Sequence, residues 1–222
     1  MSVTLAIECS QRGGGVAMRD TSGEIHTASL ESASGVDDRL MSEIDRLFAD
    51  AGLAPDTLSL IGVSIGPGGF TGLRIAVTTA KTLALSTGCD VVAVQTALVV
   101  AGSRSGPAAR IGVLLASRRG TAWLSCVDSG LQITGTPGLV NAVSIGPALA
   151  GCEVCIADAH LPPELAGAVR DVGVPMEPPR FDPVICLNLA EQCHARGEIV
   201  DTHHLEPLYP RIPEAVRLFE AR

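Results

Sequence analysis

The residues with the clearest chemical potential form a glycine-rich turn, residues 66–74 (GPGGFTGLR). The turn separates an apolar, strand-like segment from a segment with helical periodicity. Backbone N–H groups at such a turn can hold an anion at the helix N-terminus. The glycine spacing is not GxGxxG, and no Lys-Ser/Thr pair completes a P-loop. Two interpretations stay open: a tight turn that serves helix packing, or an anion-binding turn formed by Gly66, Gly68 and Gly69.

A second candidate lies where the first strand-like segment ends. Glu8 and Ser10 stand there, shortly before three consecutive glycines at 13–15. A carboxylate at the end of a strand can hold a hydrated metal ion beside a nucleotide. A solvated hairpin end accounts for the same residues without a ligand, and it is the interpretation we favour.

The other reactive side chains follow no familiar catalytic pattern. No two of the five histidines form HxxxH or HExxH, and no GxSxG occurs. Cys152 and Cys155 form a CxxC, but on a strand they would point to opposite faces. We therefore predict no catalytic residues and no metal ligands, with zinc as the less favoured alternative. The seven cysteines are interpreted as reduced, mostly buried thiols.

Composition limits the classes of function. The 222 residues are 46% hydrophobic and carry a formal net charge of −8, with a single lysine, Lys81. A chain without a basic face is expected to meet nucleic acid only through a basic partner. The longest apolar region, 75–101, is interrupted by Lys81 and by the Gly-Cys-Asp at 88–90, which argues against a membrane span. The start of the chain lacks the pattern of a signal peptide, so we expect a cytoplasmic protein.

Hydrophobic periodicity predicts a mixed-sheet α/β protein. We expect a first lobe formed by residues 1–103 and joined by 184–222, and a smaller second lobe, 104–183. The expected strands are 3–9, 15–19, 24–30, 58–65, 90–94, 111–116, 122–127 and 153–157, and the expected helices are 37–51, 71–86, 96–101, 164–170 and 184–196. An irregular connector is expected at 175–183 and an extended tail at 205–213.

The expected helix 71–86 is apolar around most of its circumference, so it must be buried on more than one side. Gly72, Ala76 and Ala80 recur at every fourth position and permit close helix approach. Either both sides pack inside the monomer, or one side meets another subunit. With helix 37–51 beside it, a two-helix dimerisation face is predicted, with partner-binding residues Met41, Asp45, Phe48, Thr71, Arg74, Thr78 and Lys81.

Several of these segments resemble one protein family. Residues 66–75 closely resemble the signature of the TsaB (YeaZ) family, accessory subunits in bacterial tRNA threonylcarbamoyladenosine synthesis. Residues 5–10 resemble the opening strand of that family, 117–120 (SRRG) its second-lobe hairpin, and 207–211 (PLYPR) its closing motif. The order and spacing cover most of the chain, and 130–200 is matched weakly.

The resemblance implies a two-lobed actin-like ATPase/sugar-kinase (ribonuclease H-like) fold with mixed sheets. It implies a non-catalytic accessory, dimerising subunit that supports a TsaD-like transferase through the two helices, with a TsaE-like ATPase as a further partner. Transfer RNA would be met only through the complex. A homodimer is one expected state of the isolated chain. No cofactor is expected to bind tightly, although ATP or ADP could bind weakly or at an interface.

Departures from the family pattern concern nucleotide chemistry. Where relatives usually have Asp, His, Ser and Asp, this chain has Glu8, Val36, Gly69 and Ala116. The resemblance thus implies a vestigial nucleotide or anion turn. The alternative function is a small-molecule kinase or ATPase of the same fold that acts alone, against which Ala116 argues. A peptidase would need a metal-ligand cluster or a nucleophile that the sequence does not offer.

Overall fold

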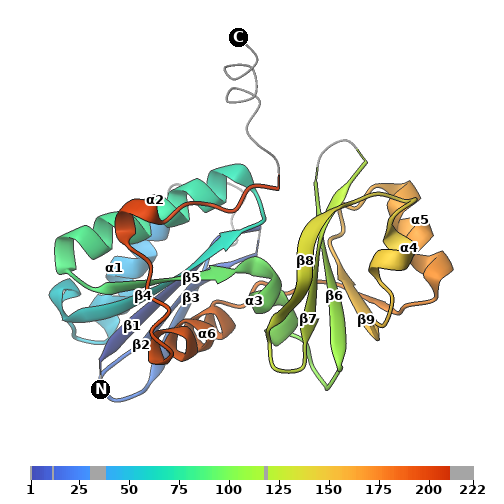
Figure 1. Ribbon diagram of the computed structural model, residues 1–222. Helices are drawn as coiled ribbons and strands as arrows, with labels where there is room; N and C mark the ends of the chain where they lie inside the picture. The colour runs from blue at the N-terminus through green and yellow to red at the C-terminus, as the bar shows by residue number, and fades with distance from the viewer. Residues whose placement is uncertain (1, 12, 31–38, 118–119, 211–222) are drawn as a thin grey trace, which may run out of the picture. The chain divides into compact units, whose positions relative to one another are not determined.

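The computed structural model describes residues 2–11, 13–30, 39–117 and 120–210 (Figure 1). Its contacts divide the chain into two compact units. The first comprises Met1–Arg104 and Arg180–Pro207, and the second comprises Ser105–Pro179 with residues 208–210. In the part that the structure describes, no helix is both long and apolar enough to span a bilayer.

The first unit is built on a five-stranded mixed sheet in the order β3-β2-β1-β4-β5. The three N-terminal strands are antiparallel neighbours, as their short connections predict, and β4 and β5 run parallel to β1. The strands are β1 Val3–Glu8, β2 Gly15–Arg19, β3 Ile25–Ser29, β4 Leu58–Gly66 and β5 Asp90–Gln95. The helices are α1 Leu40–Asp50, η1 Pro55–Thr57, α2 Phe70–Thr87, α3 Thr96–Gly102, α6 Pro183–Ala195 and η2 Thr202–His204.

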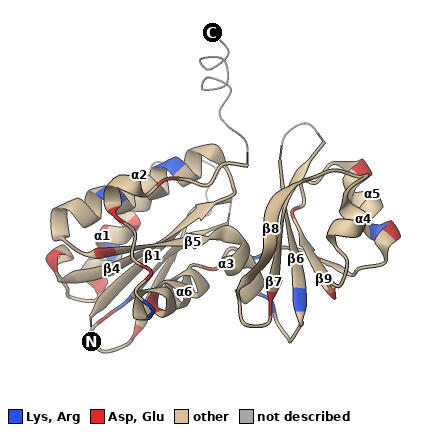
Figure 2. Ribbon diagram, viewed as in Figure 1, with Lys and Arg blue, Asp and Glu red and all other residues tan. Residues whose placement is uncertain are grey.

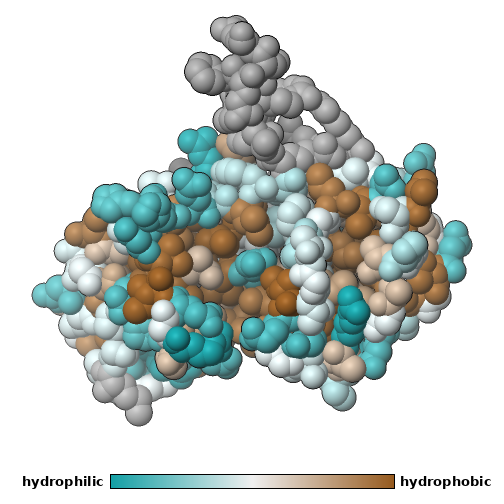
Figure 3. All heavy atoms as spheres, in the orientation of Figure 1, coloured by the Kyte–Doolittle hydropathy of each residue, from teal (hydrophilic) through white to brown (hydrophobic). Residues whose placement is uncertain are grey.

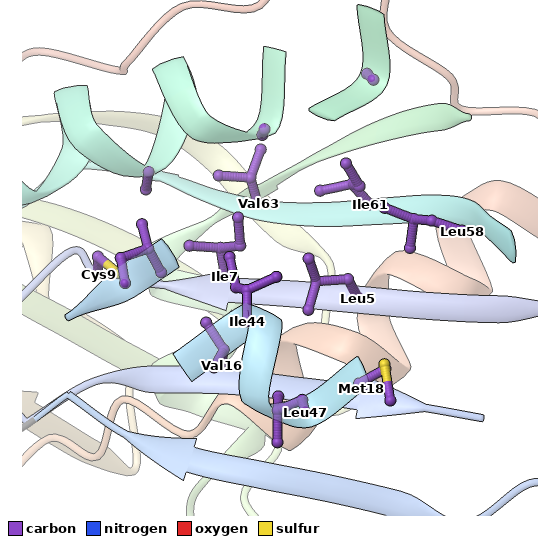
Figure 4. Close-up of a cluster of buried hydrophobic side chains, with 14 of the residues drawn as sticks. Leu5, Ile7, Cys9, Val16, Met18, Ile44, Leu47, Leu58, Ile61 and Val63 are labelled. Carbon is purple, nitrogen blue, oxygen red and sulfur yellow. The ribbon is translucent and has the colours of Figure 1, made fainter. Parts of the chain in front are cut away.

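Helices cover both faces of this sheet, with α1 and α2 on one face and α6 on the other (Figure 1). Alternation along β1 sends Leu5 and Ile7 toward the first pair of helices, where they join a core with Ile44 and Leu47 of α1 (Figure 4). On the opposite face α6 lies so close that a Cβ added at Gly62 would be 2.3 Å from Ala190 Cβ.

Polar contacts also fasten α6 to the first unit. Arg19 Nε of β2 lies 3.0 Å from Glu191 Oε1, and His194 Nε2 lies 2.8 Å from Asp90 Oδ2 at the start of β5. The chain therefore returns from the second unit to complete the first.

The small residues of α2 face the monomer's own core. Ala76 and Ala80 are fully buried in the cluster that includes β1 and β4 residues, and a Cβ at Gly72 would lie 2.3 Å from the carbonyl oxygen of Cys9. The side of α2 that carries this stripe therefore packs inside the monomer, and contact of its exposed side with another subunit stays a prediction. The stripe is not available to another subunit.

The second unit contains another five-stranded mixed sheet, in the order β10-β9-β6-β7-β8. Leu165 and Val169 of α5 and Ile145 of α4 pack with strand residues in one buried cluster. The elements are β6 Arg110–Ala116, β7 Ala122–Asp128, β8 Ile133–Val140, α4 Ile145–Ala148, β9 Val154–Ala157, α5 Pro163–Val172 and β10 Met176–Glu177.

The strands and helices predicted from periodicity are present, with shifts at their ends. The expected helix 37–51 begins at Leu40 in the structure, and residues 37–38 lie outside the described residues, as do 211–213 of the expected tail. Five elements were missed: β8, α4, β10 and the short helices η1 and η2. Strand β8 contains Gly135, Pro137 and Gly138, which an edge strand tolerates and a sequence pattern reads as a loop.

Candidate functional site

The structure brings the two glycine-flanked candidates together. The N–H of Gly69 donates to the carbonyl oxygen of Ser10 at 2.7 Å, so the glycine-rich turn lies directly against the end of β1. A Cβ added at Gly68 would be 2.2 Å from that same oxygen. Gly66 has φ 113°, a conformation that favours glycine. The turn therefore needs glycine for backbone contact, whereas its role in anion binding stays a prediction.

Glu8 is fully buried, so the interpretation as a solvated hairpin end is wrong. Alternation along β1 directs Glu8 to the face that α6 covers. Its Oε1 accepts hydrogen bonds from Ser10 N at 2.8 Å and from Ser10 Oγ at 2.5 Å. Its Oε2 is buried, and no hydrogen-bond partner for it is found among the described residues.

Two residues that the sequence did not single out complete this polar cluster. Ser64 of β4 and Thr96 at the start of α3 are buried, and their hydroxyl oxygens are 2.9 Å apart. Polar residues within otherwise apolar segments are the signal that could have found them. Burial raises the pKa of Glu8, and the hydroxyls of Ser10 and Ser64 offset that rise only in part.

A buried carboxyl with a raised pKa fits poorly as a ligand for the metal ion of a nucleotide. Such an ion needs carboxylates that are ionised and reachable. Burial raises the pKa of Glu8 and so disfavours its ionised form, the side chain is out of reach of solvent, and Ser10 donates to one of its oxygens. The residues present therefore do not support a metal-nucleotide role for Glu8.

Glu8→Gln is expected to make stability less dependent on pH. Because the pKa of Glu8 is raised by folding, its stabilising contribution is complete below the unfolded pKa and is lost as pH rises through the folded pKa. Glutamine resembles the protonated acid and does not titrate. Thermal denaturation should show the variant gaining on the native protein between pH 5 and pH 8, by on the order of 1–3 kcal/mol.

Asp56→Asn is the matched control, because Asp56 is exposed in η1. It should leave the pH profile of the native protein unchanged. Parallel profiles for the native protein and Glu8→Gln would contradict a raised pKa of Glu8.

The predicted partner-binding residues of α1 divide into exposed and buried ones. Met41 is 54% exposed, and Asp45 is exposed one turn further along the same face. Phe48 is 2% exposed and packs in the core with Ile44. Its assignment to a surface was wrong, because its ring faces the sheet.

The predicted residues of α2 lie mostly on its outer face. Thr71, Arg74 and Thr78 are exposed, and the Arg74 guanidinium stands 5.1 Å from the centroid of the Phe70 ring. Lys81 is half-buried, and its Nζ donates to the carbonyl oxygen of His203 in η2 at 3.4 Å. Figure 2 shows these basic positions along α2.

Two large apolar residues on this face were not predicted from the sequence. Phe70 is 52% exposed and Leu85 is 66% exposed, near opposite ends of α2. With Met41, Asp45, Thr71, Arg74 and Thr78 they form what we term the α1/α2 face. Apolar residues that fall on the same helix face as polar ones, at helical spacing, are the sequence signal that could have indicated Phe70 and Leu85.

A cluster of possible ligands at the β2–β3 hairpin is explained by the hairpin itself. Donor atoms of Asp20, Glu24 and His26 lie within 4.8 Å of one another. Asp20 accepts from the N–H groups of Ser22 and Glu24, and His26 Nε2 is 3.0 Å from its Oδ2. Hydrogen bonds from Ser22 and His26 lower the pKa of Asp20, which therefore works as a turn-stabilising carboxylate.

Comparison with known proteins finds chains that are similar in sequence and chains that are similar in structure. A family model described as "TsaD: tRNA N6-adenosine threonylcarbamoyltransferase" matches residues 32–126. The tRNA threonylcarbamoyladenosine biosynthesis protein TsaB of Bacillus subtilis is 39% identical over 82 residues. That alignment covers 37% of this chain and spans 36% of the curated relative.

Solved structures match nearly the whole chain. YeaZ from Pseudomonas aeruginosa aligns with a TM-score of 0.79 and 22% identity, over 94% of this chain and 100% of that one. A second P. aeruginosa structure, described as an uncharacterized protein with similarity to peptidase YEAZ, has a TM-score of 0.79 and 23% identity, over 95% and 100% of the two chains. The predicted two-lobed actin-like (ribonuclease H-like) α/β fold is confirmed.

Proposed function

We propose that this chain, which its sequence relative and its fold support as a TsaB (YeaZ)-family protein, is a non-catalytic accessory subunit in tRNA threonylcarbamoyladenosine synthesis. In this proposal it acts in the cytoplasm and supports a TsaD-like transferase, with a TsaE-like ATPase as a further partner. The matches to a TsaB protein and to the TsaD family model favour this pathway over others.

The observation that carries the proposal is the α1/α2 face. Met41, Phe70 and Leu85 are each more than half exposed, although each could bury a large apolar side chain in a complex. Polar residues, among them Arg74 and Thr78, lie between them on α2. Figure 3 shows that apolar and polar groups also lie side by side on the face of the first unit that Figure 1 presents. A mixed surface of this kind is typical of a subunit interface with an apolar centre and a polar rim.

Charge favours a role for the partner in binding tRNA. The net charge of −8 and the single lysine leave this chain poorly suited to hold a phosphate backbone by itself. We propose that tRNA contacts the complex through a more basic subunit. A homodimer through the α1/α2 face would compete with the partner for the same residues.

A nucleotide-dependent enzyme acting alone is the second candidate. It would need an exposed carboxylate at the end of β1, where Glu8 is instead buried with a raised pKa. We therefore expect ATP or ADP to bind weakly, if at all, and without turnover by this chain.

Size-exclusion chromatography with light scattering tests the proposal. Mixing the chain with the TsaD-like protein of the same organism should give a defined heterocomplex. Thr78→Glu should weaken that complex at least tenfold, because a carboxylate would enter the centre of the face and neutralise Arg74 nearby, a loss of about 1.4 kcal/mol or more. Thr78 is exposed, so the variant should fold normally.

Thr27→Glu is the matched control. Thr27 is exposed in the same unit, and Ala28 beside it points into the core under α1 and α2, so Thr27 faces the other side of the sheet. This variant should bind the partner like the native chain. Absence of any heterocomplex, or equal weakening by both variants, would refute the assignment of the α1/α2 face.

A further inference from the structure

Three cysteines gather around one glycine in the sheet of the second unit. Gly112 of β6 pairs with Cys126 on β7 and with Cys155 on β9, its two neighbouring strands. Cys152 precedes β9, and a Cβ added at Gly112 would lie 3.5 Å from its Sγ. All three thiols belong to the buried cluster formed with α4 and α5.

Two of these thiols are in contact. Cys126 Sγ and Cys152 Sγ are 3.8 Å apart, although 26 positions separate them in sequence. A disulfide requires about 2.05 Å, so the sulfurs would have to approach by less than 2 Å in total, roughly 1 Å each. Gly112 lets the side chains of the cluster lie close to the sheet, since a Cβ there would be 2.6 Å from Leu149 Cδ2 and 3.5 Å from Cys152 Sγ.

A half-buried cation lies beside the pair. Arg110 Nε has no hydrogen-bond partner among the described residues, although it is shielded from solvent. A hydrogen bond from Cys152 and the neighbouring Arg110 guanidinium lower the pKa of the Cys126 thiol, and the same contact with Cys126 raises the pKa of Cys152. The Cys126 sulfur is therefore the one that more readily becomes a thiolate, and the Cys152 sulfur is the one that keeps its proton.

We propose that Cys126 and Cys152 form an oxidisable dithiol, with Cys126 as the attacking thiolate and Cys152 as the resolving thiol. The site would react with a hydroperoxide and would be restored by a small dithiol. This site lies in the second unit and is independent of the accessory role proposed above.

The reaction is balanced with hydrogen peroxide as the oxidant. The Cys126 thiolate attacks one peroxide oxygen, the O–O bond breaks, and the departing hydroxide takes a proton to become water. Cys152 then attacks the sulfenic sulfur of Cys126, the S–O bond breaks, and hydroxide leaves with the Cys152 proton as a second water. Each sulfur loses one electron, and peroxide gains two.

Solvent exposure distinguishes Cys126 and Cys152 from the third thiol of this cluster, so an oxidant should reach the pair first. Cys126 and Cys152 each retain 8% exposure, whereas Cys155 retains none. Cys193 in the first unit is similarly exposed, so its peptide is an internal reference for a thiol outside the cluster.

The full-length chain is treated with hydrogen peroxide at pH 7, denatured, and analysed by thiol titration and peptide mass spectrometry. Of the seven thiols, two should disappear, with loss of two hydrogen atoms in mass and a cross-linked peptide that joins Cys126 to Cys152. Dithiothreitol should reverse the change. Closure of this loop should raise Tm by roughly 5 °C.

Variants assign the roles within the pair. Cys152→Ser should leave Cys126 as a sulfenic acid that dimedone traps, and Cys155→Ser should still form the cross-link. Arg110→Met should slow oxidation at pH 7 about tenfold and recover at higher pH, whereas Arg110→Lys should retain the native rate more closely. Retention of all seven thiols in the native chain, or a cross-link that omits either cysteine, would overturn the proposal without reference to any variant.

Discussion

Gly68→Ala is expected to destabilise the first unit by about 3 kcal/mol or more, which corresponds to a loss of roughly 6–12 °C in Tm. The added methyl group would lie 2.2 Å from the carbonyl oxygen of Ser10 and 2.9 Å from its carbonyl carbon. These are backbone atoms that cannot rotate away. The glycine-rich turn would therefore have to separate from the end of β1, with loss of the hydrogen bond from Gly69 to Ser10.

Gly69→Ala is the matched control at the neighbouring position. A Cβ at Gly69 would be 3.6 Å from the same oxygen, which is an ordinary contact, and Gly69 has φ −65°. The variant should keep a Tm close to that of the native protein, and Gly69→Ser should be tolerated in the same way. Thermal denaturation of the native protein and the three variants tests this expectation, and equal losses in Tm at both positions would contradict the backbone contact described for Gly68.

Ala76→Glu is expected to unfold the first unit, because it places a carboxylate in a fully buried position. Ala76 packs in the core with Val63 and Ile7, where no water can solvate the charge. An unpaired buried charge costs several kcal/mol, on the order of 3–5 by analogy with broken buried ion pairs. Circular dichroism should show loss of cooperative thermal unfolding.

Ala76→Glu must be distinguished from a variant that only weakens binding. Thr78→Glu changes the same helix two residues further along, where the side chain is exposed, and should keep the native Tm. Loss of the heterocomplex by Ala76→Glu would therefore report unfolding, whereas loss by Thr78→Glu would report the interface. A well-folded Ala76→Glu protein would show that α2 is less tightly packed on the sheet than described.

The sequence by itself determined the order of elements and the position of the glycine-rich turn. Residues 58–65 and 71–86 show strand and helix periodicities that are local properties of the chain, because each element repeats its own pattern of buried positions. The glycine turn between them, and its resemblance to a known family, required only neighbouring residues. Strand β8 was not predicted, because its glycines and proline carry the local signal of a loop.

Only the tertiary structure decided which side chains face solvent and which distant residues meet. Met41 and Phe48 both fall on one apolar helix in the sequence, yet one is exposed and the other lies in the core. Glu8 is buried because α6, some 175 positions further along, covers that face of the sheet. The thiols of Cys126 and Cys152 meet beside Gly112 of β6, the strand that lies between β7 and β9. Such contacts depend on how the elements pack, and no local pattern encodes that.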